Sequence, residues 1–358
     1  MKLLVDAHVF DGKFQGTRTY LEGIYQKLIL HNNIDFYFAA HDIDNLKNVF
    51  GTRNNVNYVQ LENVGSIKRL ALIWPKIIKK YNIDWAHYQY ISPLRKCCKE
   101  IITTHDLLFL DMPEFFPLSY RMKNRFFFYR SAKRADLLLT VSDFSKKEIV
   151  NHFKISPEKI YITPNSVLPI EDSIFLPDVK KKWNLNHFIL TVGRYEPRKN
   201  LVILMKAFAD LELQKKGYKL VIIGSPDINY KEFYDFLNKA DDSLKSAIIT
   251  DKASFPELVA LYKQTDLFVF PSLGEGFGIP PLEAIVYGAP LLCSKVTAMA
   301  EFELPEETLF TPTNVVELKN KMRNILSGAT INIDRDKIIE KFNWQHSADV
   351  IYDKLMNN

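Results

Sequence analysis

Two acidic residues in a glycine-rich stretch are the strongest sign of chemistry in this sequence. The stretch PSLGEGFGIPPLEA covers residues 271–284 and carries Glu275 and Glu283. It follows an expected strand and opens an expected helix, where free backbone N–H groups and the helix dipole attract phosphate or sugar oxygens. Its three glycines permit close approach of a ligand and a positive φ. Carboxylates accept hydrogen bonds from neutral hydroxyls, so the stretch predicts polyol groups beside a phosphate, as in a nucleotide-sugar.

A second group of charged residues follows another expected strand. The stretch TVGRYEPRKN, residues 191–200, places Arg194, Arg198 and Lys199 just before a helix. Cations at a helix N-terminus oppose the helix dipole, so solvation alone explains them poorly and an anionic ligand is favoured. When a nucleoside diphosphate leaves, negative charge grows on its distal phosphate, and fixed cations stabilise that charge without a metal ion.

Two weaker patterns lie in the first half of the chain. His105-Asp106 follows an expected strand, where a neutral imidazole can exchange hydrogen bonds with a sugar hydroxyl. The alternative is a histidine whose hydrogen bonds are satisfied inside the fold. The Asp42-x-Asp44 pair looks like a metal-binding acidic pair, but it lies among polar loop residues, so we expect no metal requirement.

The elements that must position these residues alternate between strand and helix patterns. Strands are expected at 2–8, 35–41, 100–106, 136–142, 187–195, 219–225, 246–252, 266–272 and 289–294, and helices at 17–31, 66–81, 200–211, 281–288 and 341–358. This order predicts an α/β fold of two Rossmann-like, doubly wound domains, with ligands beyond the carboxyl ends of the strands. The boundary should fall between Pro164 and Pro177. We therefore expect domains at 1–168 and 169–340, with the helix at about 341–358 packing back on the first.

Composition limits the class of protein. The chain has 358 residues, 47% hydrophobic and 25% charged, which is ordinary for a globular protein. Three cysteines make no disulfide framework, and no apolar run is long enough to span a membrane. We therefore expect a cytoplasmic protein.

Positive charge is concentrated in the first half. Residues 1–168 carry 24 Lys and Arg against 16 Asp and Glu, whereas the remainder carries 23 against 26. The stretches 66–81 and 121–134 combine Lys and Arg with apolar residues and contain no acid. We expect them to contact an anionic membrane at the inner face of the cytoplasmic membrane. The alternative is that their apolar residues pack on the first sheet. No nucleic-acid-binding module accompanies the charge, so nucleic acid is not an expected partner.

Together these motifs resemble the retaining nucleotide-sugar glycosyltransferases of the GT-B kind, in which two Rossmann-like domains face a central cleft, and specifically glycosyltransferase family 4. The matching residues are Gly193-Arg194, Pro197–Asn200, Pro271-Ser272, Glu275–Gly278, Glu283-Ala284 and Gly288–Pro290, with HDL at 105–107, ADLLLTVSDFSKKEI at 135–149 and ITPNSV at 162–167.

The resemblance implies a role for each matched residue. Arg194 and Lys199 would bind the donor diphosphate, Glu275 would bind the donor sugar, and Glu283 would bind the ribose. The backbone N–H groups of Phe277, Gly278 and Ile279 would face phosphate or sugar. His105 would lie near the donor and the acceptor, and Gly16 would approach the diphosphate. Gly276 and Lys252 complete the expected donor-binding residues, and His105, Arg194, Lys199 and Glu275 are the expected catalytic residues. The nucleotide-sugar is a substrate, so no cofactor is expected.

The resemblance also implies a reaction. We expect a retaining, metal-independent hexosyltransferase that moves mannose from GDP-mannose to a hydroxyl of a lipid-linked glycan, in cell-surface polysaccharide or lipopolysaccharide synthesis. The alternatives are a nucleotide-sugar 2-epimerase and a non-catalytic glycan-binding subunit. An NAD-dependent oxidoreductase is disfavoured because Ile279 stands at the third glycine position of the dinucleotide fingerprint.

Overall fold

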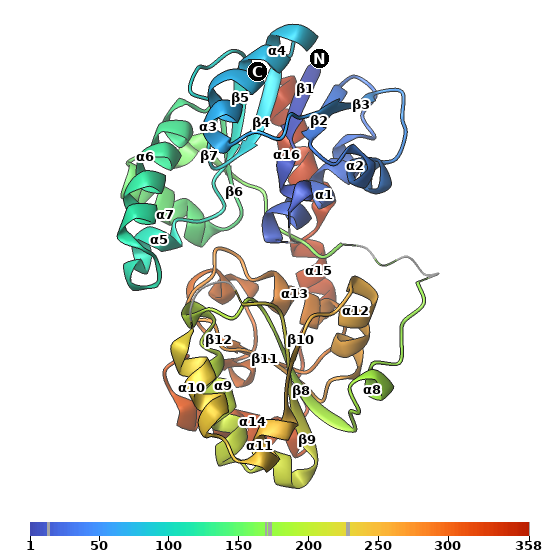
Figure 1. Ribbon diagram of the computed structural model, residues 1–358, viewed down its shortest axis with the longest axis vertical. Helices are drawn as coiled ribbons and strands as arrows, with labels where there is room; N and C mark the ends of the chain where they lie inside the picture. Colours follow the sequence, from blue (N-terminus) through green and yellow to red (C-terminus); the bar gives the residue numbers. More distant parts are fainter. Residues whose placement is uncertain (13–14, 169, 171–173, 227–229, 358) are drawn as a thin grey trace. The chain divides into compact units, whose positions relative to one another are not determined.

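The computed structural model describes residues 1–12, 15–168, 170, 174–226 and 230–357, and the chain forms two compact units (Figure 1). Unit 1 comprises Met1–Leu168 and Phe342–Asn358, and unit 2 comprises Pro169–Lys341. Each unit buries its own apolar core between a parallel sheet and the helices on its two faces. This arrangement confirms the predicted fold class of two Rossmann-like, doubly wound domains.

In unit 1 the described residues form a seven-stranded parallel sheet in the order β3-β2-β1-β4-β5-β6-β7. Its strands are β1 (Lys2–Asp6), β2 (Asp35–Ala40), β3 (Val56–Gln60), β4 (Trp85–Gln89), β5 (Lys99–Thr103), β6 (Leu137–Thr140) and β7 (Ile160–Ile162). Its helices are α1 (Gly16–Leu28), α2 (Ile43–Phe50), α3 (Ser66–Lys68), α4 (Trp74–Tyr81), α5 (Leu108–Asp111), α6 (Leu118–Arg134), α7 (Asp143–Phe153) and α16 (Trp344–Met356). The order of strands reverses between β1 and β4, where such sheets place their ligands.

In unit 2 a six-stranded parallel sheet runs in the order β10-β9-β8-β11-β12-β13, counted over the described residues. Its strands are β8 (His187–Val192), β9 (Tyr218–Ile223), β10 (Ile248–Asp251), β11 (Leu267–Phe270), β12 (Leu291–Ser294) and β13 (Leu309–Phe310). Its helices are α8 (Val179–Lys182), α9 (Leu201–Asp210), α10 (Lys231–Lys239), α11 (Asp242–Ala247), α12 (Phe255–Gln264), α13 (Ile279–Val286), α14 (Val315–Leu326) and α15 (Arg335–Lys341). The loops after β8 and β11 therefore leave two adjacent central strands at the point where the strand order reverses.

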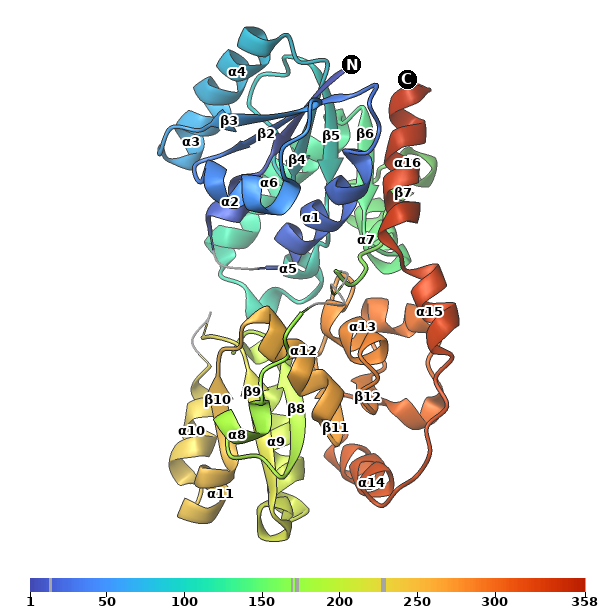
Figure 2. The same ribbon diagram turned by 90° about the vertical axis from the view of Figure 1, so that its right-hand side faces the viewer.

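The last helix of the chain returns to unit 1 and packs against α1 (Figure 2). Trp344 fits against α1 because Gly23 has no side chain; a Cβ at Gly23 would lie 2.1 Å from the indole ring. The indole nitrogen donates a hydrogen bond to the Val167 carbonyl (3.1 Å), and Ser347 Oγ donates to the Pro164 carbonyl (2.8 Å). These contacts fix α16 to residues 164–167, which follow β7 in unit 1.

The stretch 66–81 differs from the single helix expected there. A π-helical turn at Arg69–Ile73 separates α3 from α4, and the Trp74 N–H donates to the Arg69 carbonyl. Pro75 explains the wider turn, because it has no N–H for the carbonyl one turn earlier and its ring crowds that position. Trp74, Ile77 and Ile78 are buried in the core of unit 1.

Strands β3, β4, β7 and β13 were not among the expected strands. In β4, His87 and Gln89 break the apolar pattern, yet both are buried in the middle of the sheet. The Nδ1 atom of His87 lies 2.7 Å from the Tyr25 hydroxyl, and its Nε2 atom lies 2.8 Å from Thr103 Oγ1. These side chains satisfy each other's hydrogen bonds, which is why polar residues are tolerated in a central strand.

Candidate active site

The loop after β8 carries the expected cations. Gly193 and Arg194 follow the strand, and a short 3-10 turn at Pro197–Lys199 leads into α9. The loop passes close to Gly224, which follows β9; a Cβ at Gly224 would lie 1.9 Å from the Gly193 carbonyl oxygen. Glycine at 224 is therefore required for the two loops to lie side by side, a constraint that the sequence alone did not reveal.

Glu275 is held in the loop after β11 by three donors from unit 2. Its Oε1 atom lies 2.7 Å from Lys199 Nζ, 3.1 Å from Arg198 Nη1 and 2.5 Å from Ser272 Oγ. We call Arg198, Lys199, Ser272 and Glu275 the donor cluster. Burial disfavours the ionised carboxyl, but the two cations and the hydrogen bonds outweigh it and hold the pKa of Glu275 at about 2. Glu275 is therefore a fixed carboxylate at neutral pH.

The three donors converge on one oxygen of Glu275 and leave the other available. Among the described residues, Oε2 has no hydrogen-bond or ion-pair partner, and the side chain is 12% exposed. Because its position is fixed by the contacts at Oε1, Oε2 can accept a hydrogen bond from a ligand hydroxyl without rearrangement.

Arg198 has a different position from the one expected for a diphosphate ligand. It is buried and paired with Glu196, whose Oε1 lies 2.5 Å from Nη2, and it also donates to the Gly274 carbonyl. Part of the negative charge that stabilises Arg198 at this helix start is therefore supplied by Glu196. Arg198 ties the two loops together and orients Glu275. Arg194, four residues earlier in the chain, is exposed.

The start of α13 lies at the other end of the β11 loop. Of the three glycines in this loop, only Gly278 has a positive φ, +102°, among the residues that the structure describes. Pro280 and Pro281 have no N–H, and the amides of Gly278 and Ile279 make no backbone hydrogen bond within the described chain. The free donors at this helix start are thus at positions expected to face phosphate or sugar.

Glu283 lies one turn into α13 and is partly buried. Its Oε2 atom accepts a hydrogen bond from the Tyr262 hydroxyl at 2.9 Å. Burial raises the pKa of Glu283 to about 7, although the Tyr262 hydrogen bond acts in the opposite direction. Glu283 is therefore not a solvated residue on the exposed face of the helix.

In unit 1, His105 is buried and faces Gln89. Its Nε2 atom lies 2.7 Å from Gln89 Oε1, and its ring packs edge-on to Tyr20 with centroids 4.9 Å apart. Burial lowers the pKa of His105 to about 3, so the imidazole is neutral. An amide oxygen only accepts hydrogen bonds, so Nε2 carries the proton and Nδ1 is the acceptor nitrogen.

The remaining predicted residues occupy two other places. Gly16 is exposed at the first position of α1. Lys252 is exposed after β10, an edge strand separated from β8 by β9, and the described residues show no contact between it and the donor cluster. Asp42 caps α2 by accepting a hydrogen bond from the Asn45 N–H at 3.0 Å, so the Asp42-x-Asp44 pair belongs to a helix start. The roles of Gly16 and Lys252 stay predictions.

Sequence reasoning missed two residues that position the predicted ones. Gln89 fixes the tautomer of His105, and its own amide nitrogen lies 3.1 Å from His87 Nε2. Thr297 accepts a hydrogen bond from the Glu275 N–H at 2.9 Å and has φ of +49°, which is unusual for a β-branched residue. No motif marks either residue, since both act through contacts between distant segments.

Comparison with known proteins agrees with this fold. A family model for glycosyl transferases group 1 matches residues 177–342, and one for Glycosyltransferase Family 4 matches residues 36–168. The serotype-specific mannosyltransferase WbdA of Escherichia coli is 29% identical over 232 residues, which are 60% of this chain and 28% of WbdA. The O-antigen chain mannosyltransferase B of E. coli is 29% identical over 300 residues, 74% of this chain and 76% of that protein. The chain thus spans under a third of the length of WbdA.

A solved structure shows the same fold. The structure of Anabaena HepE in complex with UDP and glucose has a TM-score of 0.70 and 18% identity, and the match covers 100% of this chain and 99% of HepE. The two parallel-sheet domains and this likeness show the GT-B fold, and the matched family models show a glycosyltransferase. With both family models matched in order along the chain, it belongs to the family 4 type of these glycosyltransferases, as its motifs predicted.

Proposed function

We propose that the protein is a retaining mannosyltransferase that transfers mannose from GDP-mannose to a glycan hydroxyl in cell-surface polysaccharide or lipopolysaccharide synthesis. The observation that carries the donor class is the Glu275 carboxylate, fixed at Oε1 by Lys199 and open at Oε2. The choice of mannose rests on the similarity of the chain to the mannosyltransferases WbdA and O-antigen chain mannosyltransferase B. The matched families are transferases and do not favour the epimerase alternative.

In the proposed mechanism, each part of unit 2 binds one part of the donor. Glu275 Oε2 accepts a hydrogen bond from a sugar hydroxyl, and Lys199 and Arg194 face the diphosphate. As the glycosidic bond breaks, the negative charge that grows on the distal phosphate is stabilised by these cations and by the amides at the start of α13. Glu283 accepts the two ribose hydroxyls. No divalent ion is needed at the diphosphate, so added Mg²⁺ or Mn²⁺ should not raise kcat.

The retaining outcome follows from the side on which the acceptor attacks. A leaving diphosphate oxygen deprotonates the acceptor hydroxyl on the face that the leaving group vacates, so the anomeric configuration is kept. His105, neutral and with Nδ1 as an acceptor, orients a hydroxyl of the acceptor.

A nucleotide panel tests the donor. A ligand that binds only the folded state raises the melting temperature by mass action, so we expect GDP and GDP-mannose to raise it and UDP, ADP and CMP to leave it unchanged. The anomeric configuration of the product is then read by NMR. A shift with UDP alone would overturn the base, and an inverted product would overturn the retaining mechanism.

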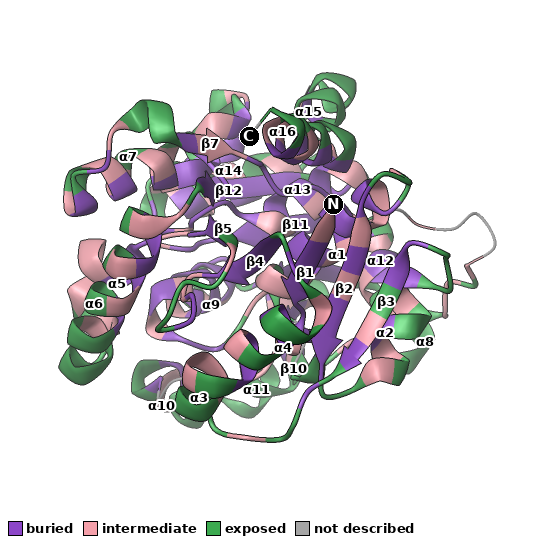
Figure 3. Cartoon of the chain, turned by 90° about the horizontal axis from the view of Figure 1, so that it is seen from above, coloured by how far each residue is buried: buried purple, intermediate pink, exposed green. Residues whose placement is uncertain are grey.

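The acceptor, we further propose, is lipid-linked, and α6 docks unit 1 on the anionic inner face of the cytoplasmic membrane. Leu118, Met122 and Phe126 recur every four residues on one face of α6 and are 63%, 67% and 62% exposed. Lys123 and Arg125 are exposed on the same helix, and residues 121–134 contain no acid. Figure 3 shows that α6 carries both exposed and intermediate segments. The apolar face suits a bilayer interface, and the charge complements anionic lipid. No helix in the described chain has the length and apolar character to cross a membrane.

A second group of exposed apolar residues lies near α6, and hydrogen bonds connect its segment to this helix. Arg130 on α6 donates to the Pro93 carbonyl at 3.1 Å, and the Leu94 N–H donates to the Leu70 carbonyl at 3.2 Å. The loop at Pro93-Leu94 thus connects α6 with the π-helical turn, next to the exposed Ile67 and Leu72. The buried apolar residues of 66–81 pack in the core, so only these exposed ones are available to the lipid.

Vesicle flotation tests the membrane contact. We expect the protein to float with vesicles that contain phosphatidylglycerol and not with pure phosphatidylcholine. Met122→Asp with Phe126→Asp should reduce the bound fraction about tenfold, since two apolar side chains then no longer enter the interface. Val316→Asp, at an equally exposed position on α14 of unit 2, is the matched control. Flotation that does not depend on lipid charge, or an equal decrease of the bound fraction in the α6 variant and the Val316→Asp control, would contradict the proposal.

A further inference from the structure

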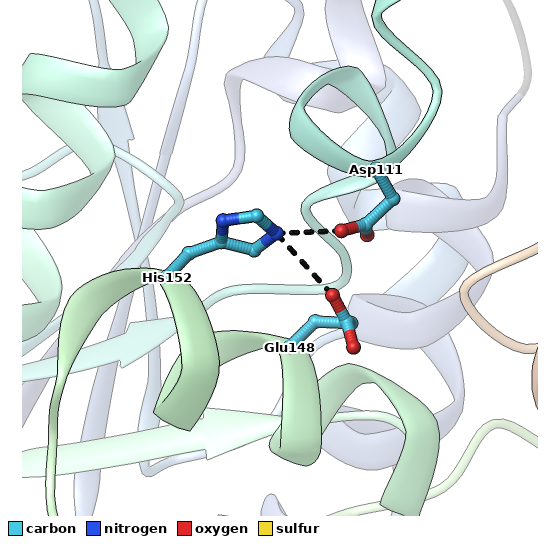
Figure 4. Close-up of side chains that lie close together, drawn as sticks. All are labelled: Asp111, Glu148 and His152. Carbon is cyan, nitrogen blue, oxygen red and sulfur yellow. Dashed lines mark hydrogen bonds and ion pairs between the residues drawn. The ribbon is translucent and has the colours of Figure 1, made fainter.

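A cluster of two carboxylates and one imidazole joins α5 to α7 in unit 1, and its residues belong to no part of the proposed site (Figure 4). Asp111 is the last residue of α5, and Glu148 and His152 lie one turn apart on α7. The Nε2 atom of His152 lies 2.6 Å from Asp111 Oδ1 and 3.3 Å from Glu148 Oε2. One atom from each residue lies within 4.8 Å of the other two, and all three side chains are partly buried.

Hydrogen bonds within the cluster do not satisfy it. Nε2 of one imidazole carries at most one proton, yet it faces carboxyl oxygens from both Asp111 and Glu148. The second oxygen of Asp111, Oδ2, is buried and has no hydrogen-bond partner among the described residues. A positively charged partner at this position would pair with both carboxylates and with the open Oδ2 atom.

A divalent metal ion supplies that charge with the right chemistry. An imidazole nitrogen and carboxylate oxygens are zinc ligands at about 2.0–2.2 Å, which places tetrahedral ligand atoms roughly 3.4 Å apart. The observed separations of 2.6 and 3.3 Å require only a small opening of the cluster. Two carboxylates and a neutral imidazole would balance a 2+ ion, and residues four apart on α7 present their ligand atoms on one helix face.

We propose that Asp111, Glu148 and His152 bind one divalent transition-metal ion, Zn²⁺ in preference to Mg²⁺, which ties α5 to α7. The imidazole selects against Mg²⁺, which prefers oxygen ligands. The ion has a structural consequence for the rest of unit 1. Asp106 Oδ1 accepts a hydrogen bond from the Leu108 N–H at 3.2 Å, so α5 begins directly after the segment that carries His105. A metal that fixes α5 therefore restrains the His105 segment. The proposal does not rest on the identity of the donor.

Zinc titration of the untagged, chelator-treated full chain tests the site. We expect isothermal titration calorimetry to give one ion per chain with a micromolar or tighter Kd, and Zn²⁺ to raise the melting temperature by mass action. His152→Gln keeps a polar side chain next to Asp111, so it should fold, and it should weaken zinc binding about 100-fold and abolish the thermal shift. Glu148→Gln should weaken binding as well.

The matched control is His187→Gln in unit 2. His187 Nδ1 also pairs with a carboxylate, lying 3.2 Å from Asp266 Oδ1, but no third ligand accompanies that pair among the described residues. Zinc binding should be unchanged in this variant. X-ray absorption at the zinc edge should show only nitrogen and oxygen ligands. Unchanged affinity in His152→Gln, an equal loss in His187→Gln, or no binding by the wild type at 100-fold excess of zinc over protein would each overturn the proposal.

Discussion

Lys199→Met should lower kcat by about a thousandfold while the protein stays folded. Methionine keeps an unbranched apolar stem near Phe270, whose ring centroid lies 5.3 Å from Lys199 Nζ, but it removes the charge. Loss of one preorganised charge at a leaving group costs roughly 10²–10³ in kcat. Lys199 also fixes Glu275 Oε1, so its loss additionally loosens the sugar-binding carboxylate, which places the effect at the upper end. Single-turnover kinetics with the donor identified by the nucleotide panel measures it.

Two controls apply to this variant: its melting temperature, and the removal of a charge at an exposed lysine outside the site. Arg198 and Ser272 still reach Glu275 Oε1, so we expect the melting temperature to fall by only a few degrees. Lys206→Met removes an exposed cation from α9, just beyond the same loop, and should leave kcat unchanged. If Lys199→Met turned over at the wild-type rate, the assignment of the diphosphate to this loop would be wrong.

Glu283→Gln should weaken donor binding about 100-fold and at the same time stabilise the fold at alkaline pH. The affinity falls because an amide cannot replace a carboxylate that accepts two ribose hydroxyls, and hydrogen bonds to a charged group contribute about 1.5–3 kcal/mol each. Isothermal titration with a nucleotide-sugar measures the loss. The exposed Glu232 on α10 provides the control, since Glu232→Gln should change neither affinity nor stability.

The stability effect follows from the raised pKa of Glu283, about 7 against 4.5 for an unperturbed glutamate. The folded state favours the protonated acid, so this contribution to wild-type stability is complete below pH 4.5 and is lost as the pH rises through 7. Glutamine does not titrate. The melting temperature of the variant relative to the wild type should therefore rise by a few degrees between pH 4.5 and pH 8. A purely structural role would instead give a variant that is less stable at both pH values.

The same pKa makes donor binding depend on pH in the wild type. Ribose hydroxyls bind the carboxylate, so binding releases a proton, and affinity should decrease as the pH falls below about 7. A nucleotide-sugar has no phosphate group that titrates in this range, so it is the appropriate ligand. Glu283→Gln should remove the dependence. A wild-type affinity that is constant between pH 5.5 and 8 would contradict the role of Glu283.

The sequence pattern predicted a strand or helix correctly where the burial of each residue depends mainly on its neighbours in the sequence. β8, β9 and β11 each contain a run of buried, mostly apolar residues, because helices cover both faces of the sheet, and each of these runs is visible in the sequence. β4 was missed because its polar residues His87 and Gln89 are made tolerable only by Tyr25 and Thr103, which come from other elements. The helix expected at 66–81 is interrupted because Pro75 lacks an N–H and widens the turn that precedes it.

By itself the sequence determined the family, the two-domain α/β fold and the residue types of the donor site. It did so because strand–loop–helix motifs such as 191–200 and 271–284 keep their loop at the carboxyl edge of a sheet wherever the chain folds that way. Only the tertiary structure decided which cation does which task. Arg198 and Lys199 are adjacent in sequence, yet Arg198 pairs with Glu196 and ties two loops together, whereas Lys199 pairs with Glu275 through Oε1. Hydrogen bonds and ion pairs between segments 76 residues apart fix these roles, and no local pattern records them.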